Sequence, residues 1–279
     1  MIAHEFDYVK PASLAQALDL LAHDDAKALS GGMSLIPMMK LRLAMPGTLV
    51  DLSGIPELTT IQVDEDILIG ALTTHFEIES SRLIRDLCPL LAETAAQIGD
   101  VQVRNLGTIG GAAAHNDPAA DYPAALIALN AMVRLASKTG ARVMRYADFI
   151  VDALTTALEP GEIITHIVVP TEGADTGTCY QKVPQAASGY AVVGIAARIT
   201  KEGGTITKAR IGVTGLASKA FRALKTEEAL LHGFSASDAA ALVADGIDAS
   251  ADIHTSADYR KHLARVHTAR AITAALAKC

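Results

Sequence analysis

The sequence has few cysteines, no tryptophan and no recognisable spacing of metal ligands. Its three cysteines, Cys88, Cys179 and Cys279, lie far apart, and no C-x-x-C motif occurs. An iron–sulfur cluster needs about four thiolates, so this chain alone ligates none. The nine histidines are scattered, without H-E-x-x-H or a similar motif. We therefore assign no metal site to the chain.

Positive charge and long apolar runs are also scarce. The chain carries 24 Lys and Arg against 31 Asp and Glu, a formal net charge of −7. Binding to nucleic acid or to an anionic membrane needs concentrated positive charge, so both are disfavoured. No uninterrupted apolar run approaches the about 18 residues of a membrane span, and residues 1–7 do not resemble a signal peptide. We expect a cytoplasmic protein with no integral membrane segment and no nucleic-acid partner.

One central stretch, residues 104–122, has three glycines within five positions. Gly107, Gly110 and Gly111 are followed by three alanines, so this backbone carries almost no side-chain bulk and something large should lie against it. Paired glycines can adopt φ > 0 and turn successive N–H groups toward a phosphate or pyrophosphate. A phosphate cradle is the first hypothesis, and a tight turn between buried segments is the alternative. The low side-chain content argues against an amphipathic helix here.

A second glycine pair, Gly31 and Gly32, follows a strand-like run and precedes a helix-like one. Ser34 is a candidate N-cap for that helix, which would add free N–H groups. Two glycine cradles in one chain suit a diphosphate. Neither stretch matches G-x-G-x-x-G or G-x-x-x-x-G-K-[ST], so the Rossmann and P-loop interpretations fail at the motif level.

Periodicity and turn signals predict alternating strands and helices. Capping-box patterns at residues 13–16 and 74–77 indicate two helix starts. Residues 171–178 have no apolar period and many turn-forming residues, which predicts a domain boundary there. We expect strands at residues 6–9, 26–30, 48–52, 60–63, 67–71, 132–137, 141–146, 163–169, 190–200 and 205–214, and helices at 35–43, 74–85, 90–98, 222–231, 237–244 and 256–277, with others starting near 14 and 122.

The two glycine stretches carry a family resemblance. Ser30-Gly31-Gly32-Met33-Ser34 and Thr108-Ile109-Gly110-Gly111-Ala112 resemble the flavin-pyrophosphate loops of FAD-binding (medium) subunits of molybdenum hydroxylases. These subunits form the carbon monoxide dehydrogenase / xanthine dehydrogenase family, and the likeness is to its carbon monoxide dehydrogenase branch. Further matches follow in order along the chain, at residues 37–44, 49–52, 69–75, 114–121, 187–194 and 256–260.

The resemblance implies an α+β fold in two domains. A two-lobed PCMH-type FAD-binding domain would span residues 1–173, with lobes at about 1–54 and 55–173. A C-terminal domain of the carbon monoxide dehydrogenase flavoprotein type, a sheet plus helices, would span residues 174–279. The cofactor would be FAD, with no catalytic residue in this chain, and the implied binding residues are Leu29, Ser30, Gly31, Gly32, Met33, Ser34, Leu35, Ile36, Ile98, Thr108, Ile109, Gly110, Gly111, Ala112, Asp121, Ile164, Lys182 and Tyr190.

Three of these residues have open alternatives. Asp121 would either cap the following helix or contact ribityl or ribose hydroxyl groups. Lys182 would be a solvated strand lysine or, by resemblance, a cation beside the flavin that stabilises its reduced form. Tyr190 would be a buried strand tyrosine or, by resemblance, the ring that packs on the isoalloxazine. Met33 and Ala112 depart from the family pattern, which has Gln or His and Ser or Asn there.

By the same resemblance, the protein is an oxidoreductase subunit that transfers electrons. A large partner subunit with molybdopterin would oxidise the substrate, a small subunit with 2Fe–2S clusters would pass electrons on, and FAD would deliver them to an external acceptor. The assembly would be a heterotrimer or a dimer of heterotrimers. The alternative is a self-sufficient FAD-dependent oxidoreductase of the same fold type, which would need a substrate pocket with a base.

Overall fold

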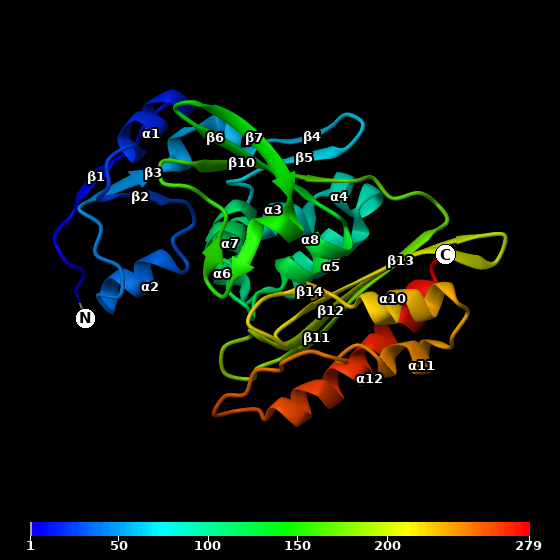
Figure 1. The fold of residues 1–279 in the computed structure, drawn as a ribbon. Coiled ribbons are helices and arrows are strands. Elements are labelled where there is room, and N and C mark those ends of the chain that lie inside the picture. The colour runs from blue at the N-terminus through cyan, green and yellow to red at the C-terminus, as the bar shows by residue number, and fades with distance from the viewer. Residues whose placement is uncertain (1) are drawn as a thin grey trace.

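A computed structural model describes residues 2–279, and its first lobe is built on a small parallel sheet (Figure 1). Helix α1 (Leu14–Leu21) begins at Ser13, whose hydroxyl accepts a hydrogen bond from the Gln16 N–H, as predicted. Helix α2 (Leu35–Lys40) starts where predicted but is shorter than predicted, and Ser34 occupies its N-cap position without a side-chain capping hydrogen bond. The three strands lie in the order β1 (Asp7–Val9), β3 (Thr48–Asp51) and β2 (Ala26–Leu29).

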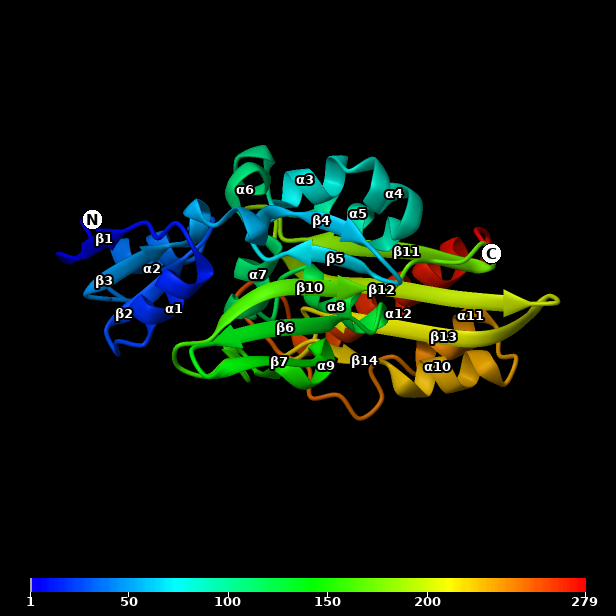
Figure 2. The same cartoon turned by 90° about the horizontal axis from the view of Figure 1, so that it is seen from above.

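A five-stranded antiparallel sheet forms the frame of the second lobe. Both predicted hairpins and the predicted strand that lies between them are confirmed. Two short 3-10 turns, Leu52–Gly54 and Pro56–Thr59, connect this sheet to the first lobe, which lies at one end of the molecule (Figure 2). The strand order is β4 (Ile61–Val63), β5 (Ile67–Gly70), β10 (Ile163–Val169), β6 (Met132–Ser137) and β7 (Gly140–Arg145).

Short helices pack beside this sheet, and one of them starts as predicted. The Thr74 hydroxyl accepts from the Glu77 N–H while the Glu77 carboxylate accepts from the Thr74 N–H, which confirms the capping box. The predicted helix over residues 74–85 is interrupted at Ser81, because the Ser81 hydroxyl caps a new helix by accepting from the Ile84 N–H. The helices are α3 (His75–Ser80), α4 (Arg82–Leu87), α5 (Pro89–Ala96), α6 (Val101–Leu106), α7 (Ile109–His115), α8 (Tyr122–Ala128) and α9 (Tyr146–Phe149).

The central glycine–alanine stretch contains a helix that the sequence analysis did not predict. Helix α7 begins at Thr108, whose hydroxyl accepts from the Gly111 N–H. A Cβ added to Gly110 would lie 2.4 Å from the Ala71 Cβ, so the small residues let α7 approach its neighbours closely. A helix made mostly of glycine and alanine has no amphipathic stripe, so the sequence pattern gave no signal for it.

The C-terminal part of the chain is an antiparallel sheet covered by three helices. The long strands predicted at residues 190–200 and 205–214 are confirmed, and the final helix starts at Ser256, whose hydroxyl accepts from the Tyr259 N–H. Figure 1 shows α10 to α12 on one face of this sheet and α5 and α8 on the other. The elements are β11 (Thr176–Pro184), β12 (Ala191–Glu202), β13 (Thr205–Thr214), β14 (Phe221–Arg222), α10 (Leu224–Leu231), α11 (Ala236–Ala241) and α12 (Ala257–Leu276).

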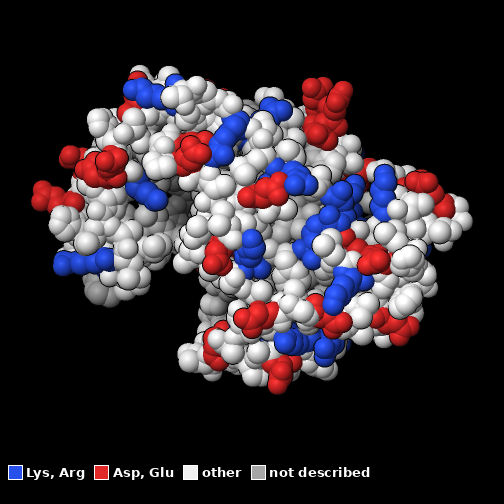
Figure 3. All heavy atoms as spheres, viewed as in Figure 1, with Lys and Arg blue, Asp and Glu red and all other residues white. Residues whose placement is uncertain are grey.

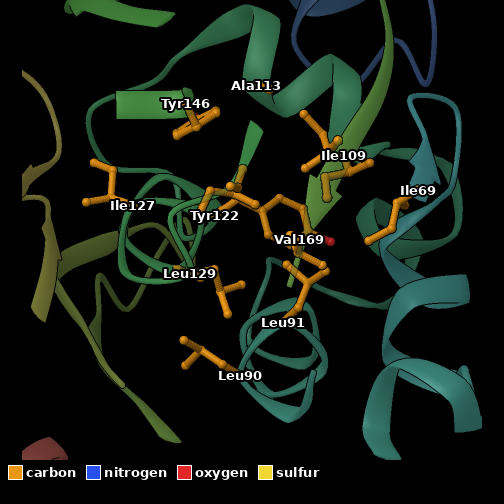
Figure 4. Packing of buried hydrophobic residues seen from close by; sticks show 14 of the residues in the cluster. Ile69, Leu90, Leu91, Ile109, Ala113, Tyr122, Ile127, Leu129, Tyr146 and Val169 are labelled. Carbon is orange, nitrogen blue, oxygen red and sulfur yellow. The ribbon is translucent and has the colours of Figure 1, made fainter. Parts of the chain in front are cut away.

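The second lobe and the C-terminal sheet share one hydrophobic core. Every residue of α8 is buried, and Tyr122 lies beside Leu91 and Val169 in Figure 4. Tyr180 of β11 and Ala196 of β12 belong to the same buried cluster. Helices α5 and α8 are therefore the layer between the two sheets, and they fix the C-terminal sheet relative to the second lobe.

This layer predicts a strong steric effect at Gly212 of β13. A Cβ there would lie 2.0 Å from the Ala124 carbonyl oxygen of α8, so Gly212→Ala must push helix and strand apart. We expect a loss of about 1–3 kcal/mol in the free energy of unfolding, as for other overpacked sites. Urea titration measures it. Gly173→Ala is the control, because its added Cβ would meet no atom within 4 Å, and equal stability of both variants would contradict the packing argument.

A buried histidine links α3 to the second glycine stretch. His75 is 4% exposed, its ring lies edge-on to Tyr122 at 5.2 Å between centroids, and its Nδ1 has no hydrogen-bond partner among the described residues. A Cβ on Gly107 would lie 2.7 Å from His75 Nε2. Burial, helped by the nearby Arg104 charge, lowers the pKa of His75 from 6.5 to about 4. The ring is therefore neutral at pH 7.

The lowered pKa predicts acid sensitivity with a defined sign. In the unfolded chain this histidine takes up a proton near pH 6.5, whereas the folded chain resists protonation down to about pH 4. The contribution of the neutral His75 ring to the free energy of unfolding is therefore fully present above pH 6.5 and is lost as the pH falls toward 4. The loss is about 2–3 kcal/mol at about pH 4.5. Urea unfolding of the wild type and of His75→Gln at about pH 7 and about pH 4.5 measures the difference. Identical losses in both proteins would assign the acid sensitivity to other groups.

Candidate functional site

The two glycine stretches lie against each other, although they belong to different lobes. A Cβ on Gly31 would lie 1.9 Å from the Leu106 carbonyl oxygen and 2.8 Å from the Gly107 Cα, so no other residue fits there without movement. Next to this contact, Ser30 Oγ and Thr108 Oγ1 are 2.6 Å apart. Because the Thr108 hydroxyl also accepts from the Gly111 N–H, its own proton is available to Ser30. One hydrogen bond thus joins two segments that are 78 residues apart.

The first stretch has the features of an anion cradle. Gly32 has a φ of +73°, in the left-handed region that the sequence argument requires. In the part of the chain that the structure describes, the N–H groups of residues 31–34 donate to no protein acceptor. Successive N–H groups without partners, at a position where the chain leaves β2, form a concavity suited to phosphate oxygens. Met33 is 37% exposed and adds no hydrogen-bonding group.

The second stretch differs from the cradle that the sequence suggested. Gly110 and Gly111 do not have positive φ values. The N–H groups of Ile109 and Gly110 donate to the Thr73 and Ala71 carbonyl oxygens, and those of Gly111 and Ala112 donate to the Thr108 hydroxyl and carbonyl oxygens. The positive-φ expectation is therefore wrong here, and the glycines are explained by close packing. The second stretch forms a compact wall beside the first.

Asp121 and Lys182, singled out separately in the sequence, form a buried ion pair. Lys182 Nζ donates to Asp121 Oδ2 at 2.8 Å and to the Gln97 carbonyl oxygen at 2.7 Å, and its side chain is 3% exposed. The Tyr180 hydroxyl donates to the other Asp121 oxygen at 2.6 Å. Asp121 makes no side-chain bond to the helix that follows, so the capping alternative is wrong, and Lys182 is not a solvated lysine.

The electrostatics of this trio follow from its burial. Burial raises the pKa of the Asp121 carboxyl, and the Lys182 ammonium and the two hydrogen bonds oppose that rise. Burial and the Asp121 charge hold the pKa of Tyr180 well above its ordinary value, so its hydroxyl remains a donor. A Cβ on Gly194 would lie 2.4 Å from Tyr180 Oη, so Gly194 provides the room for this hydrogen bond. Sequence reasoning missed Tyr180 and Gly194, although residues 180 and 182 share one face of a strand.

Tyr190 lies in the connection that leads into β12. It is 44% exposed, so the buried-strand alternative is wrong. Burial of the rest of the ring, with the charges of Asp117 and Asp121, raises the pKa of Tyr190. The preceding residue, Gly189, has a φ of +74°. A Cβ added to it would lie 3.5 Å from the Gly99 Cα, so this connection lies against the turn after α5.

The remaining predicted residues occupy the surroundings of the glycine stretches. Leu29 ends β2, whereas Leu35 and Ile36 open α2. Ile98 follows α5 and is packed, half-buried, against the main core, and Ile164 on β10 is 5% exposed. Among residues 2–279 no group of three or more His, Cys, Asp or Glu side chains could hold a metal ion, and no helix could cross a bilayer.

Comparison with known proteins gives the family. The family described as "FAD binding domain in molybdopterin dehydrogenase" matches residues 4–172, and "CO dehydrogenase flavoprotein C-terminal domain" matches residues 178–275. The carbon monoxide dehydrogenase medium chain of Hydrogenophaga pseudoflava is 38% identical, with 100% of both chains covered. The glyceraldehyde dehydrogenase medium chain of Sulfolobus acidocaldarius is 37% identical over 97% of this chain and 98% of that one.

A solved structure agrees with the sequence relatives. A carbon monoxide dehydrogenase chain from Hydrogenophaga pseudoflava superimposes with a TM-score of 0.96 at 40% identity, covering 100% of both chains. The α+β architecture expected from the sequence is thus confirmed, and so is FAD as the cofactor of this family. The chain belongs to the FAD-binding medium subunits of the molybdenum hydroxylase family, which are oxidoreductase subunits.

Proposed function

We propose that FAD is held where the two glycine stretches meet. The observation that carries this proposal is the run of N–H groups at residues 31–34, without protein acceptors, at the contact between Gly31 and the Leu106 carbonyl. The first stretch receives the pyrophosphate on these groups, and the second stretch closes one side of the site. The residues that hold the cofactor are Leu29, Ser30, Gly31, Gly32, Met33, Ser34, Leu35, Ile36, Ile98, Thr108, Ile109, Gly110, Gly111, Ala112, Asp121, Ile164, Lys182 and Tyr190.

In the same proposal, the C-terminal sheet supplies the groups that act on the flavin ring. Tyr190 offers a half-exposed aromatic face, and the buried Lys182 supplies a positive charge held in place by Asp121. A bound flavin accepts and releases electrons singly or in pairs, and a nearby cation favours its reduced form. Tyr180 keeps the carboxylate oriented, because its hydroxyl occupies the Asp121 oxygen that Lys182 does not.

We further propose that the chain transfers electrons and does not itself oxidise an organic substrate. Relatives along the full chain are named as medium chains of dehydrogenases, which supports a subunit role. Electrons reach this chain from 2Fe–2S clusters of a small subunit, after a large molybdopterin subunit has oxidised the substrate, and leave to an external acceptor. The assembly is a heterotrimer or a dimer of heterotrimers. The domain division at residues 173 and 174 is part of this proposal, and the cytoplasmic location stays a prediction.

The cradle is tested by Gly31→Ala. Its Cβ would lie 1.9 Å from the Leu106 carbonyl oxygen, so the two stretches must separate, and we expect the purified variant to lose most of its FAD. The control is Gly47→Ala, at the opposite end of the same small sheet, where the atoms nearest to the added Cβ belong to the movable Asp25 side chain. Flavin absorbance per protein measures the outcome, with circular dichroism to verify folding. Full FAD occupancy in a folded Gly31→Ala variant would refute the cradle.

The electron-transfer role is tested on the isolated FAD-loaded chain under anaerobic conditions. We expect no bleaching of the flavin by carbon monoxide or glyceraldehyde, the compounds named for two relatives, and full bleaching by dithionite. Adding the small and large partner subunits should make the flavin reducible by the substrate of the complex. Rapid bleaching by an organic substrate without partners would instead support the self-sufficient oxidoreductase.

A further inference from the structure

A cleft of about 300 Å³ lies between the five-stranded sheet and the C-terminal sheet. Its polar lining comes from both sides, with Asp66 at the β4–β5 turn and Asn130 before β6 facing Arg198 of β12 and Arg210 of β13. In Figure 3, acidic side chains mark the tip of the β4–β5 hairpin, and basic side chains gather below it, over the region of β12 and β13. This cleft is separate from the glycine stretches.

The cleft contains two arginines that face each other across neighbouring strands. Arg198 and Arg210 are directly opposite in the β12–β13 register, so both side chains lie on one face of the sheet. Like charges in directly opposite positions destabilise a sheet unless other groups compensate them. Arg198 has such a group, because its Nε donates to both Glu172 oxygens, at 2.7 and 2.9 Å. Its terminal nitrogens stay available to the cleft.

Arg210 has no such compensation among the described residues. Arg222 of β14 uses the other nearby carboxylate, that of Glu227, so three guanidinium groups share two carboxylates. The Arg210 guanidinium donates no hydrogen bond to the described residues, and its Nη1 is buried without a partner. Burial and the charges of Arg222 and Arg198 lower the pKa of Arg210. A half-buried cation without a partner is costly, so a counter-ion at this position would stabilise the fold.

We propose that this cleft binds a small oxyanion of the phosphate type between Arg210 and Arg198. The fork of N–H donors on a guanidinium matches two oxygens of such an ion, and Asn130, exposed at the rim, adds amide donors. The volume suits a phosphate or a small phosphomonoester and excludes a dinucleotide. Because the cleft is lined by both sheets, the bound ion ties the C-terminal sheet to the second lobe. The proposal does not depend on where FAD binds.

Asp66 is the one acidic residue in the lining of the cleft. It is exposed on the cleft rim and makes no ion pair within 4.0 Å in the part of the chain that the structure describes. If Asp66 were the natural counter-ion of Arg210, removing either charge would lower stability. If the cleft takes an external anion, removing Asp66 should strengthen anion binding, because a repulsive charge at the rim is lost.

The test is thermal unfolding of the full FAD-loaded chain in increasing inorganic phosphate, with ionic strength held constant by sodium chloride to cancel general screening. We expect the wild-type midpoint to rise saturably by about 2–4 °C. Arg210→Gln should lose this response and, in chloride alone, unfold at a higher temperature than wild type. Arg82→Gln is the control, since that side chain is 92% exposed on α4, and it should keep the response. Glycerol phosphate in place of inorganic phosphate distinguishes a phosphomonoester from the free ion.

Asp66→Asn is the second variant, and it tests phosphate binding even if Arg210→Gln does not fold. We expect Asp66→Asn to reach its plateau at a severalfold lower phosphate concentration than wild type. Three results would overturn the proposal. They are no saturable response in the wild type, an equal response in Arg210→Gln and Arg82→Gln, and a lower midpoint in chloride for Asp66→Asn together with no phosphate response.

Discussion

The contact between the Gly31 backbone and the Leu106 carbonyl is the constraint on which the site depends. It leaves no space for a side chain, and the Ser30–Thr108 hydrogen bond lies beside it. Because the small first sheet meets the second lobe there, the N–H groups of residues 31–34, which have no acceptor among the described residues, lie beside a stretch in which the N–H groups of residues 109–112 are already used. The N–H donors without protein partners thus lie on the side of the contact that residues 31–34 form. In the proposed site, a ligand with several oxygens would bind the N–H groups of the first stretch, and the second stretch would limit the space beside it.

Much of the fold could be predicted because local signals agreed with the tertiary structure. Local residue patterns specify the hairpins and the long C-terminal strands. The capping box likewise depends on two residues three positions apart, Thr74 and Glu77. Helix α7 could not be predicted in this way, since a helix made mostly of glycine and alanine shows no contrast between a polar and an apolar face. The break between α3 and α4 at Ser81 was also not predicted, because the apolar period continues through this residue. The Ser81 hydroxyl caps the second helix.

For the site, the sequence indicated residues but not their relationships. The sequence patterns around Asp121 and Lys182 are local, whereas their ion pair joins positions 61 residues apart, beyond the reach of any periodic pattern. The glycine pair at 110 and 111 suggests positive φ from the sequence, whereas close neighbouring atoms explain it in the structure. Glycine permits both an unusual φ and close approach, and only the three-dimensional surroundings distinguish these two uses.

Close approach at glycine also explains how the C-terminal sheet is fixed relative to the cradle. Gly212 lets β13 lie against α8, and Gly194 makes room for the Tyr180 hydroxyl that holds Asp121. Helix α8 directly follows Asp121, so the strand that carries Lys182 and the helix start that carries its partner are set by the same packing layer. A displacement of α8 would therefore separate the ion pair before it exposed the core, because a hydrogen bond is more sensitive to distance than apolar burial is.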